Sequence, residues 1–363
     1  MTSFGNICYD YSNTVAIFER KCNGMRVTTQ DIAKAAGVSQ STVSVVLSNN
    51  KKISISPETR AHVLKVAENL GYQFKKRVVA KEDMPVVGIL VPTWSNLYYP
   101  FLVQDIELYA RSKGLTVVIQ KTMRSEEGEI QAIQYLRSVG AQGILSLFAP
   151  KSPLPEDIPS VIIGEKLAGT EVDTISLNSY AAGRIAAEHM LSLGHKDVAF
   201  LSTPLSNITE ARRKRLEGVR DQMEEAGLGV HLHVLVDENE NEVSNQNYEF
   251  DCGMYLTEKL LQQKTNCTAI IAVNDMTAMG CISALNQHNI RIPDEMAVCG
   301  FDNLQLHRLT NPQLTSVDQM AFHGCKVGLS ILMEQMSNFT LNRDAVYMEY
   351  KPRIYARGST VKP

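Results

Sequence analysis

The sequence predicts an N-terminal all-α helix-turn-helix module followed by a two-lobed α/β core, in which helices cover parallel sheets. Three observations lead to this fold class. Residues 28–71 carry the caps and the apolar spacing of three short helices. From Pro85 onward, apolar runs alternate with amphipathic stretches, as in parallel strands joined by helical crossovers. At 363 residues, the chain exceeds what one hydrophobic core usually organises.

The three short helices of the first module follow from local chemistry. Thr28 can cap the first helix, and Gly37 can end it by supplying a left-handed residue. Ser39 is the expected cap of the second helix, and Ser56 followed by Pro57 begins the third. The positions expected to face inward are Ile32, Ala33, Ala36, Val43, Val46, Leu47, Val63, Val66, Ala67 and Leu70.

The second of these helices has the residues that reading DNA requires. Such a helix lies in the major groove, so its first turn needs short or polar side chains, here Gln40, Ser41, Thr42 and Ser44. Residues 25–82 also hold ten Lys or Arg and four acids, a net charge of +6, whereas the whole chain carries -3. A basic module on an acidic body favours phosphate binding by the module alone. An ordinary helical hairpin with a solvated charged face is the alternative.

Apolar runs in the remainder of the chain predict parallel strands. They are too numerous for one sheet, so we expect two similar lobes, with helices at amphipathic stretches such as 101–112 and 181–193. The expected strands are Val86–Val91, Leu115–Ile119, Gly143–Leu147, Val161–Ile163, Val198–Leu201, His233–Leu235, Ala269–Val273 and Ala297–Gly300.

Composition excludes several other classes of protein. Apolar residues make up 44% of the chain and charged residues 21%, as in globular proteins. The seven cysteines include no CxxC pair, so we expect reduced thiols. No secretory signal and no run of 18 apolar residues is present, which favours a cytoplasmic location. Residues 1–24 lack periodicity, and we expect them to be an unstructured or mis-assigned leader, with Met25 as the natural start.

Longer motifs make the chain similar to a known family. AspIleAlaLysAlaAlaGlyValSer at 31–39, IleSerProGluThrArg at 55–60 and LeuGlyTyr at 70–72 resemble the headpiece of the lactose-repressor (LacI/GalR) family. Further motifs follow in family order: ValProThrTrpSerAsnLeuTyrTyr at 91–99, GlyHis at 194–195, ArgLeuGluGlyVal at 215–219, AlaValAsnAspMetThrAlaMetGly at 272–280, GlyPheAspAsn at 300–303, LeuThrSerValAspGln at 314–319 and ArgGlySerThr at 357–360.

The resemblance implies a homodimer that represses transcription by reading two half-sites of a near-palindromic operator, and a core that closes on a small, sugar-like effector. Half-sites of such dimers lie roughly 34 to 36 Å apart, or at multiples of that distance. No cofactor, metal ion or membrane partner is expected. The implied domains are 25–73 for DNA binding, 74–84 for a basic hinge linker, 85–179 with 318–342 for the first lobe, and 180–317 with 343–363 for the second.

For DNA binding, the resemblance implies specific residues. Position 45 is usually Arg in this family, whereas Val45 makes no guanine contact but can pack on a thymine methyl. We therefore expect an operator that differs from the family consensus at its central step. The implied base contacts are Thr29, Gln40, Ser41 and Val45, and the implied phosphate contacts are Thr28, Ser39, Thr42, Ser44 and Ser48.

The linker departs from the family pattern. Phe74 stands where Pro is usual, and the segment is about two residues shorter than in relatives. Lys75, Lys76 and Arg77 can still meet phosphates, and Val78 and Val79 can wedge into the minor groove. A disordered basic linker is the equally weighted alternative.

Effector contacts in the core are also implied by the resemblance. Arg and Asp can bridge adjacent hydroxyls of a sugar, and aromatic faces can cover its C–H surface. Two of the residues have structural alternatives, because Asn274 can cap a helix and Asp302 can be a turn residue. Departures at Glu165, Lys166, Asn178 and Ala321 leave the effector's identity open. The implied contacts are Trp94, Asn96, Tyr98, Tyr99, Arg215, Tyr248, Asn274 and Asp302.

Two other functional classes are alternatives to a regulator. A solute-binding protein would share the two-lobed core but would need an export signal and no helix-turn-helix. A sugar-processing enzyme would need a catalytic constellation, and the sequence contains neither a nucleophile elbow nor a phosphate-binding glycine loop. His231 and His233 are expected on one face of a strand, without the cysteines or carboxylates of a metal site. The sequence therefore favours a regulator that is not an enzyme.

Overall fold

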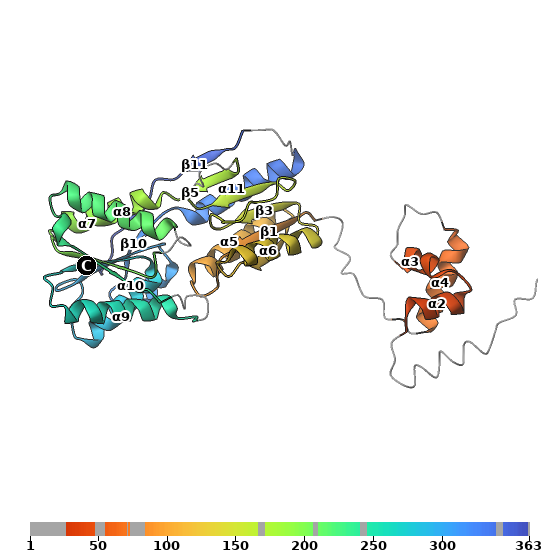
Figure 1. The fold of residues 1–363 in the computed structure, drawn as a ribbon, viewed down its shortest axis with the longest axis horizontal. Coiled ribbons are helices and arrows are strands. Elements are labelled where there is room, and N and C mark those ends of the chain that lie inside the picture. The colour runs from red at the N-terminus through yellow and green to blue at the C-terminus, as the bar shows by residue number, and fades with distance from the viewer. Residues whose placement is uncertain are drawn as a thin grey trace, which may run out of the picture. The chain divides into compact units, whose positions relative to one another are not determined.

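A computed structural model describes residues 27–47, 55–70, 72, 84–165, 171–205, 210–239, 245–338 and 344–361. The chain divides into two compact units, 1–83 and 84–363, which are described separately below (Figure 1). The expected leader, Ser48 and the expected hinge at 75–79 lie outside the described residues.

The first unit contains the three predicted helices, α2 (Thr29–Ala36), α3 (Gln40–Leu47) and α4 (Pro57–Asn69). Thr28 caps α2 through a reciprocal pair of bonds: the Asp31 backbone N–H donates to Thr28 Oγ1 over 3.3 Å, and Thr28 N–H donates to Asp31 Oδ2 over 2.9 Å. Gly37 ends α2 with φ of 65°. Thr42 N–H donates to Ser39 Oγ over 3.1 Å, which confirms the predicted cap of α3.

A small apolar core holds these three helices together. Ile32 of α2, Val43 of α3 and Val63 of α4 are fully buried and meet at its centre. Since each helix is too short to be stable alone, this shared core is what fixes their mutual geometry. The remaining buried members are Ala33, Ala36, Val46, Ala67 and Leu70.

The second unit contains two six-stranded sheets, one in each lobe. The first comprises β1 (Val86–Val91), β2 (Thr116–Lys121), β3 (Gly143–Ser146), β4 (Ser160–Ile163), β5 (Asp173–Ser176) and β11 (Tyr347–Glu349), in the order β11-β5-β4-β3-β1-β2. The second comprises β6 (Val198–Ser202), β7 (Leu232–Val236), β8 (Ala269–Ala272), β9 (Ala297–Phe301), β10 (Thr315–Asp318) and β12 (Arg353–Tyr355), in the order β12-β10-β9-β8-β6-β7.

The strand orders of the two sheets are equivalent, which confirms the prediction of two similar lobes. All pairings are parallel except that of β10 with β12, which is antiparallel. The eight predicted strands are present. The four that were not predicted, β5, β10, β11 and β12, are only three or four residues long.

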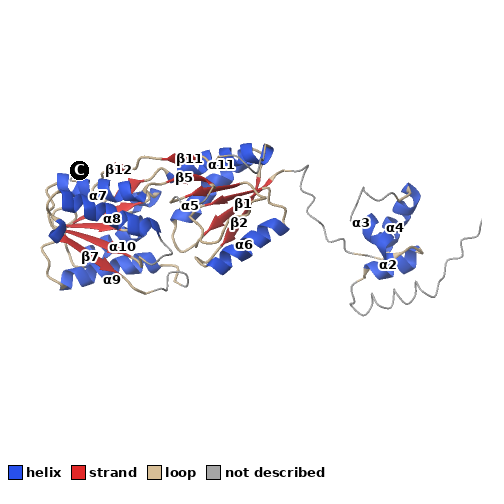
Figure 2. Cartoon of the chain, turned by 45° about the horizontal axis from the view of Figure 1, so that its top comes forward, coloured by secondary structure: helices blue, strands red, loops and turns tan. Residues whose placement is uncertain are grey.

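Helices cover both faces of each sheet (Figure 2). In the first lobe, α5 (Tyr98–Ser112) and α11 (Ala321–Ser337) pack on one face, and α6 (Glu126–Ser138) packs on the other. In the second lobe, α7 (Ser179–Ser192) and α8 (Glu210–Glu225) share one face, and α9 (Tyr248–Gln262) and α10 (Asp275–Gln287) share the other. Short 3-10 helices among the described residues span Gly229–His231 and Gln305–Leu309.

Three described segments cross between the lobes, at 176–179, 318–321 and 349–353. The last crossing corrects the expected domain boundary. We expected all of 343–363 in the second lobe, but β11 pairs with β5 and belongs to the first sheet, whereas β12 pairs with β10 of the second. Both strands are too short and too exposed to give a sequence signal.

Two glycines bring α7 and α8 into unusually close contact. A Cβ atom at Gly183 of α7 would lie 2.0 Å from the backbone oxygen of Arg215 in α8. Reciprocally, a Cβ atom at Gly218 of α8 would lie 2.0 Å from the backbone oxygen of Tyr180 in α7. The two helices therefore form one rigid pair, and the backbone of Arg215 is held at their contact.

Among the described residues, no helix combines the length and the apolar character needed to cross a bilayer. His231 differs from its predicted place, because it lies in a 3-10 helix before β7 and its Nδ1 is 2.8 Å from Asp197 Oδ1. It therefore does not share a strand face with His233.

Candidate functional site

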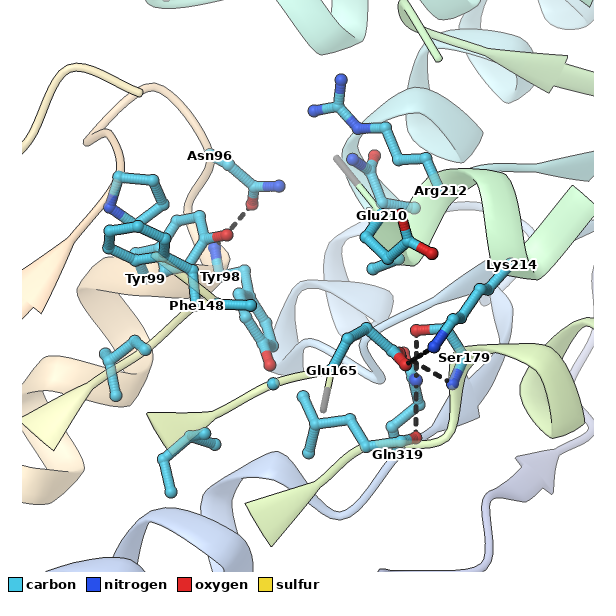
Figure 3. A pocket seen from close by; sticks show the side chains of 18 of the residues that line it. Asn96, Tyr98, Tyr99, Phe148, Glu165, Ser179, Glu210, Arg212, Lys214 and Gln319 are labelled. Carbon is cyan, nitrogen blue, oxygen red and sulfur yellow. Dashed lines mark hydrogen bonds and ion pairs between the residues drawn. The ribbon is translucent and has the colours of Figure 1, made fainter. Parts of the chain in front are cut away.

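A cavity of about 840 Å³ lies between the two lobes (Figure 3). Most of its lining follows the carboxyl ends of strands: Asn96 comes after β1, Phe148 after β3 and Glu165 after β4. From the second lobe, Asn274 follows β8 and Asp302 follows β9. In α/β folds this end of a sheet is where ligands bind. The volume is that of a typical small-molecule site.

The aromatic side chains of the cavity come from the first lobe, where they lie beside charged ones such as Arg124, Glu129 and Lys151. Tyr98, Tyr99 and Phe148 line it, and the rings of the two tyrosines meet edge to face with centroids 5.1 Å apart. Asn96 Oδ1 accepts a 2.8 Å hydrogen bond from Tyr98 N–H at the start of α5. Burial raises the pKa of Tyr98 well above its usual value, so this phenol stays protonated. This wall therefore offers flat apolar faces.

The second lobe contributes a fixed charged group, Arg215. Its Nη1 donates to the Val273 carbonyl over 2.6 Å, and its Nη2 lies 3.2 Å from Asp302 Oδ1. The guanidinium also stacks over the Phe301 ring at 4.7 Å. Gly183 also packs directly against the Arg215 backbone. These contacts together hold the Arg215 guanidinium in place beside the cavity.

Asp302 is a buried carboxylate with an unusual backbone and an unusual pKa. Its φ is 101°, at the turn that follows β9. Burial raises the pKa of Asp302 from 3.8 to about 7, despite the opposing effect of Arg215. Its charge thus changes near neutral pH.

Asn274 and Asp302 have the structural roles expected of a helix cap and a turn residue, and both also line the cavity. Asn274 caps α10, since its Oδ1 accepts from Thr277 N–H over 2.9 Å, and it also lines the cavity. Its amide nitrogen remains a potential donor to a ligand. Asp302 is likewise both a turn residue and part of the cavity wall.

Hydrogen bonds of Gln319 connect the cavity to the segments that cross between the lobes. Its Oε1 accepts from Arg215 Nη2 over 2.5 Å. Its Nε2 donates to the Leu177 carbonyl over 2.7 Å and to Ser179 Oγ over 3.1 Å. One side chain on the crossing at 318–321 thus joins a cavity residue to the crossing at 176–179.

A second buried ion pair stands behind the cavity wall. Arg212 of α8 and Glu249 of α9 are 7% and 2% exposed, and Arg212 Nη2 lies 3.2 Å from Glu249 Oε1. Arg212 also lines the cavity. Since removing one partner would leave the other charge buried, this pair fixes α8 to the opposite helix layer.

Six of the eight predicted effector residues line this cavity: Asn96, Tyr98, Tyr99, Arg215, Asn274 and Asp302. Neither Trp94 nor Tyr248 is among the described residues that do so. Trp94 is 41% exposed, and Tyr248 is buried, with its hydroxyl donating to Asp237 Oδ2 over 3.0 Å. The resemblance gave these two positions but not the direction of their side chains.

Several cavity residues were not predicted as contacts. Phe148 and Glu165 directly follow two of the predicted strands, so the rule that ligands bind beyond carboxyl ends would have found them. Gln319 belongs to a recognised motif. Arg212 and Lys214 lie on α8 and carry no such signal, because helices expose many charged residues that bind nothing.

In the first unit, the predicted DNA-reading residues gather at the start of α3. Gln40, Ser41 and Ser44 are exposed. Gln40 Nε2 donates to Thr29 Oγ1 of α2 over 3.2 Å, so two predicted base-reading side chains from different helices hold each other. Val45 is half-buried, and Thr28 and Ser39 are exposed at the two helix caps.

Hydroxyl groups beside this cluster form a second set of contacts. Ser39 Oγ lies 2.7 Å from Ser41 Oγ and 2.8 Å from Thr42 Oγ1. Short hydroxyl side chains and free N–H groups at a helix N-terminus are suited to phosphate oxygens. The predicted contacts Ser48, Lys75, Lys76, Arg77, Val78 and Val79 lie outside the described residues.

Comparison with known families gives two matches. A family described as "Bacterial regulatory proteins, lacI family" matches residues 28–74, and a "Periplasmic binding protein-like domain" matches 187–360. Among curated relatives, catabolite control protein A of Priestia megaterium is 28% identical over 350 residues, covering 93% of this chain and 100% of its own. The transcriptional repressor PurR of Vibrio parahaemolyticus is 28% identical over 344 residues, covering 92% and 99%.

Solved structures share the fold. A complex of the transcriptional regulator CelR with cellobiose has a TM-score of 0.63 at 22% identity, covering 92% of this chain and 100% of its own. A LacI family regulator from Enterococcus faecium with bound ribose has a TM-score of 0.65 at 21% identity, covering 76% and 98%. The lac repressor dimer bound to operator and the anti-inducer ONPF has a TM-score of 0.63 at 21% identity, covering 93% and 100%.

Proposed function

We propose that the chain is a member of the lacI family of bacterial regulatory proteins, a transcriptional repressor whose affinity for operator DNA is controlled by a sugar-like effector. One observation carries this proposal. A cavity of about 840 Å³ with an aromatic wall and a wall of fixed charged groups lies in the same chain as a complete helix-turn-helix. Such a combination allows one protein both to bind DNA and to respond to a small molecule.

The two walls suit a polyhydroxylated ring. Arg215 and Asp302 lie 3.2 Å apart and can bond to adjacent hydroxyls, and the Asn274 amide can add a further bond. Tyr98 and Phe148 can cover the C–H surface of the ring. Cellobiose and ribose in the related structures support the sugar class.

On the DNA side, Gln40 is the principal base reader in this proposal. Its amide can bond to both N6 and N7 of adenine, and the hydrogen bond to Thr29 restricts its orientation. Ser41 would read a neighbouring base, and Val45 would contact a thymine methyl. The caps Thr28 and Ser39, with Thr42, Ser44 and Ser48, would contact phosphates. The hinge at 75–79 would add phosphate contacts and a minor-groove wedge.

A homodimer would present two such headpieces to two half-sites, as the dimer of the lac repressor on its operator suggests. The effector can alter DNA affinity only if it binds one arrangement of the lobes more tightly than the other. Gln319 is placed to transmit that preference, because it bonds both to Arg215 and to a crossing segment. Location in the cytoplasm and the absence of enzymatic activity follow from the same proposal, supported by the regulators among its relatives.

Two measurements test the proposal. Selection from random duplexes with the full chain should return a near-palindrome with adenine opposite Gln40, and fluorescence anisotropy should then report tight, salt-dependent binding. A thermal-shift screen over sugars and nucleosides should return a sugar that changes this operator affinity. Selection without enrichment would refute DNA reading, and a stabilising ligand without effect on DNA affinity would refute the coupling.

A further inference from the structure

A second, smaller cavity of about 210 Å³ lies beside the effector cavity. Of the described residues, Glu165 and Lys214 are the two that line both cavities. Figure 3 shows the two side chains in direct contact at one side of the pocket, and Lys214 belongs to α8 of the second lobe. The pair therefore forms the wall that separates the two spaces.

This wall is held firmly by direct contacts. Lys214 Nζ donates to Glu165 Oε2 over 2.9 Å, and the backbone N–H of Ser179 donates to Glu165 Oε1 over 3.1 Å. The side chain of Glu165 is 7% exposed and that of Lys214 is 31% exposed. Both oxygens of the carboxylate are thus engaged by the second lobe, although Glu165 itself follows β4 of the first.

The ion pair keeps Lys214 charged. Burial alone would lower the pKa of Lys214, but the hydrogen bond and the charge of Glu165 outweigh burial and raise it. The Lys214 ammonium is therefore present as a donor throughout the physiological range. If the Lys214 side chain moved away, the Glu165 carboxylate would lose one of its hydrogen-bond donors.

The space behind the wall suits neutral hydroxyl groups better than anions. Tyr180 and Tyr347 line it, with Glu217 and Glu349. The two phenol hydroxyls already donate within the protein, to Asp221 over 2.8 Å and to Glu349 over 2.9 Å. A ligand would meet ring faces, the carboxylates of Glu217 and Glu349 and the neutral side chains of Ser176 and Asn178. These groups match the C–H faces and hydroxyls of a sugar ring better than phosphate or carboxylate groups.

We propose that the Glu165–Lys214 pair sets the maximum length of the effector. The pair closes the end of the cavity, so a sugar must fit within the larger space. Without the Lys214 side chain, the two cavities would be continuous and would accept a ligand about one sugar ring longer. This inference rests on the proposed sugar-sensing function and identifies Glu165 and Lys214 as determinants of its specificity.

The test compares oligomers of one, two and three glucose units, in α-1,4 and β-1,4 linkage, by isothermal titration calorimetry. Lys214→Ala removes the wall, whereas Lys214→Gln keeps its bulk and an amide donor to Glu165. Arg220→Ala removes an exposed cation from the same helix, away from both cavities, and serves as the matched control. In Lys214→Ala, the affinity for the longest oligomer relative to the next shorter one should rise about tenfold, the effect of one added ring contact. Lys214→Gln and Arg220→Ala should keep the wild-type ratio.

If Lys214→Ala instead loosened the contact between the lobes, the pattern of affinities across oligomer lengths would differ. Such loosening would change the affinity for all lengths by one factor, and that result would overturn the length limit while leaving the sugar cavity in place. A raised ratio in Lys214→Gln or in Arg220→Ala would also overturn it. If none of the oligomers bound to any of the four proteins, the length limit on such oligomers would be overturned, whereas the sugar class would be decided by the thermal-shift screen and operator binding by the same samples would be unaffected.

Discussion

The two walls of the effector cavity are built in different ways. The first lobe supplies aromatic faces such as Phe148 on loops that follow strands. The second lobe supplies Arg215 from a helix that is packed against its neighbour at Gly183 without room for a side chain. Apolar faces attract any ring of suitable size, whereas fixed charged groups require hydroxyls in particular places. We therefore expect affinity for sugars to depend mainly on the first-lobe wall, and selectivity among sugars to depend mainly on the second-lobe wall.

The largest effect is expected from Arg215→Ala. The substitution removes the bonds to Val273, Asp302 and Gln319 at once and leaves a buried carboxylate without its partner. Loss of one member of a buried pair costs about 3 kcal/mol of stability, and we expect effector affinity to fall about 100-fold or more as charged hydrogen bonds are lost. Urea unfolding and calorimetric titration measure the two losses. Arg220→Ala is the control, and an unchanged affinity would show that Arg215 only supports the fold.

A glycine substitution in each lobe compares their rigidity. Gly183→Ala places a methyl group 2.0 Å from a backbone oxygen, so α7 and α8 must separate, at a cost of about 2 to 3 kcal/mol. Gly324→Ala in α11 meets the Ile175 Cγ2 methyl at 3.1 Å and the Tyr350 ring at 3.7 Å, side-chain atoms that can shift, and should cost less than about 1 kcal/mol. Urea unfolding of both variants checks this order. Equal costs would contradict the difference in packing between the helix contacts at Gly183 and at Gly324.

The aromatic wall should control affinity without controlling selectivity. In Phe148→Ala, we expect a loss of about tenfold in affinity for every sugar that binds, because apolar contact area is removed. The order of preference among epimers should stay the same. In Asp302→Asn, the order itself should change, since a carboxylate acceptor becomes an amide. Titrations with pairs of epimers distinguish the two outcomes, and a changed order in Phe148→Ala would reject the division between the walls.

The smallest effect concerns pH. Burial raises the pKa of Asp302 from 3.8 to about 7, so the side chain is mostly protonated at pH 6 and mostly ionised at pH 8. Sugar hydroxyls donate better to the ionised form, so affinity should rise with pH across this range, by about tenfold at most. Calorimetry in buffers of different ionisation enthalpy should also detect proton release on binding. The dependence should disappear in Asp302→Asn, and its persistence would assign the titration to another group.

The sequence was most informative where structure is local. The caps at Thr28 and Ser39 and the turn at Gly37 depend on neighbouring residues alone, and all three were predicted correctly. Long apolar strands were equally visible. β5 was missed because only one of its four residues, AspThrIleSer, is apolar, although all four are buried. Asp173 is tolerated there because it accepts from Val346 N–H and from Gln335, partners that no local pattern reveals.

The site was predicted less completely than the fold, for a related reason. Resemblance placed Arg215, Asn274 and Asp302 at the cavity because each stands in a recognisable motif. It could not show that Trp94 would face outward, since side-chain direction within an irregular loop depends on tertiary packing. The contact between Glu165 and Lys214 joins residues 49 positions apart on different lobes. Its existence follows only from the way the three crossings bring the lobes together.

Those crossings also determine the order in which the protein can be completed during synthesis. The ribosome delivers β1 to β5 early, but α11 and β11 of the same lobe emerge only after β6 to β10 of the other. Because chains fold from the N-terminus as they emerge, the first lobe waits for its last helix and strand while the second is already nearly complete. A premature stop codon before Ala321 would therefore leave an intact helix-turn-helix beside an unfinished first lobe. Late truncations of the gene should thus uncouple DNA reading from effector control, whereas early ones should abolish both.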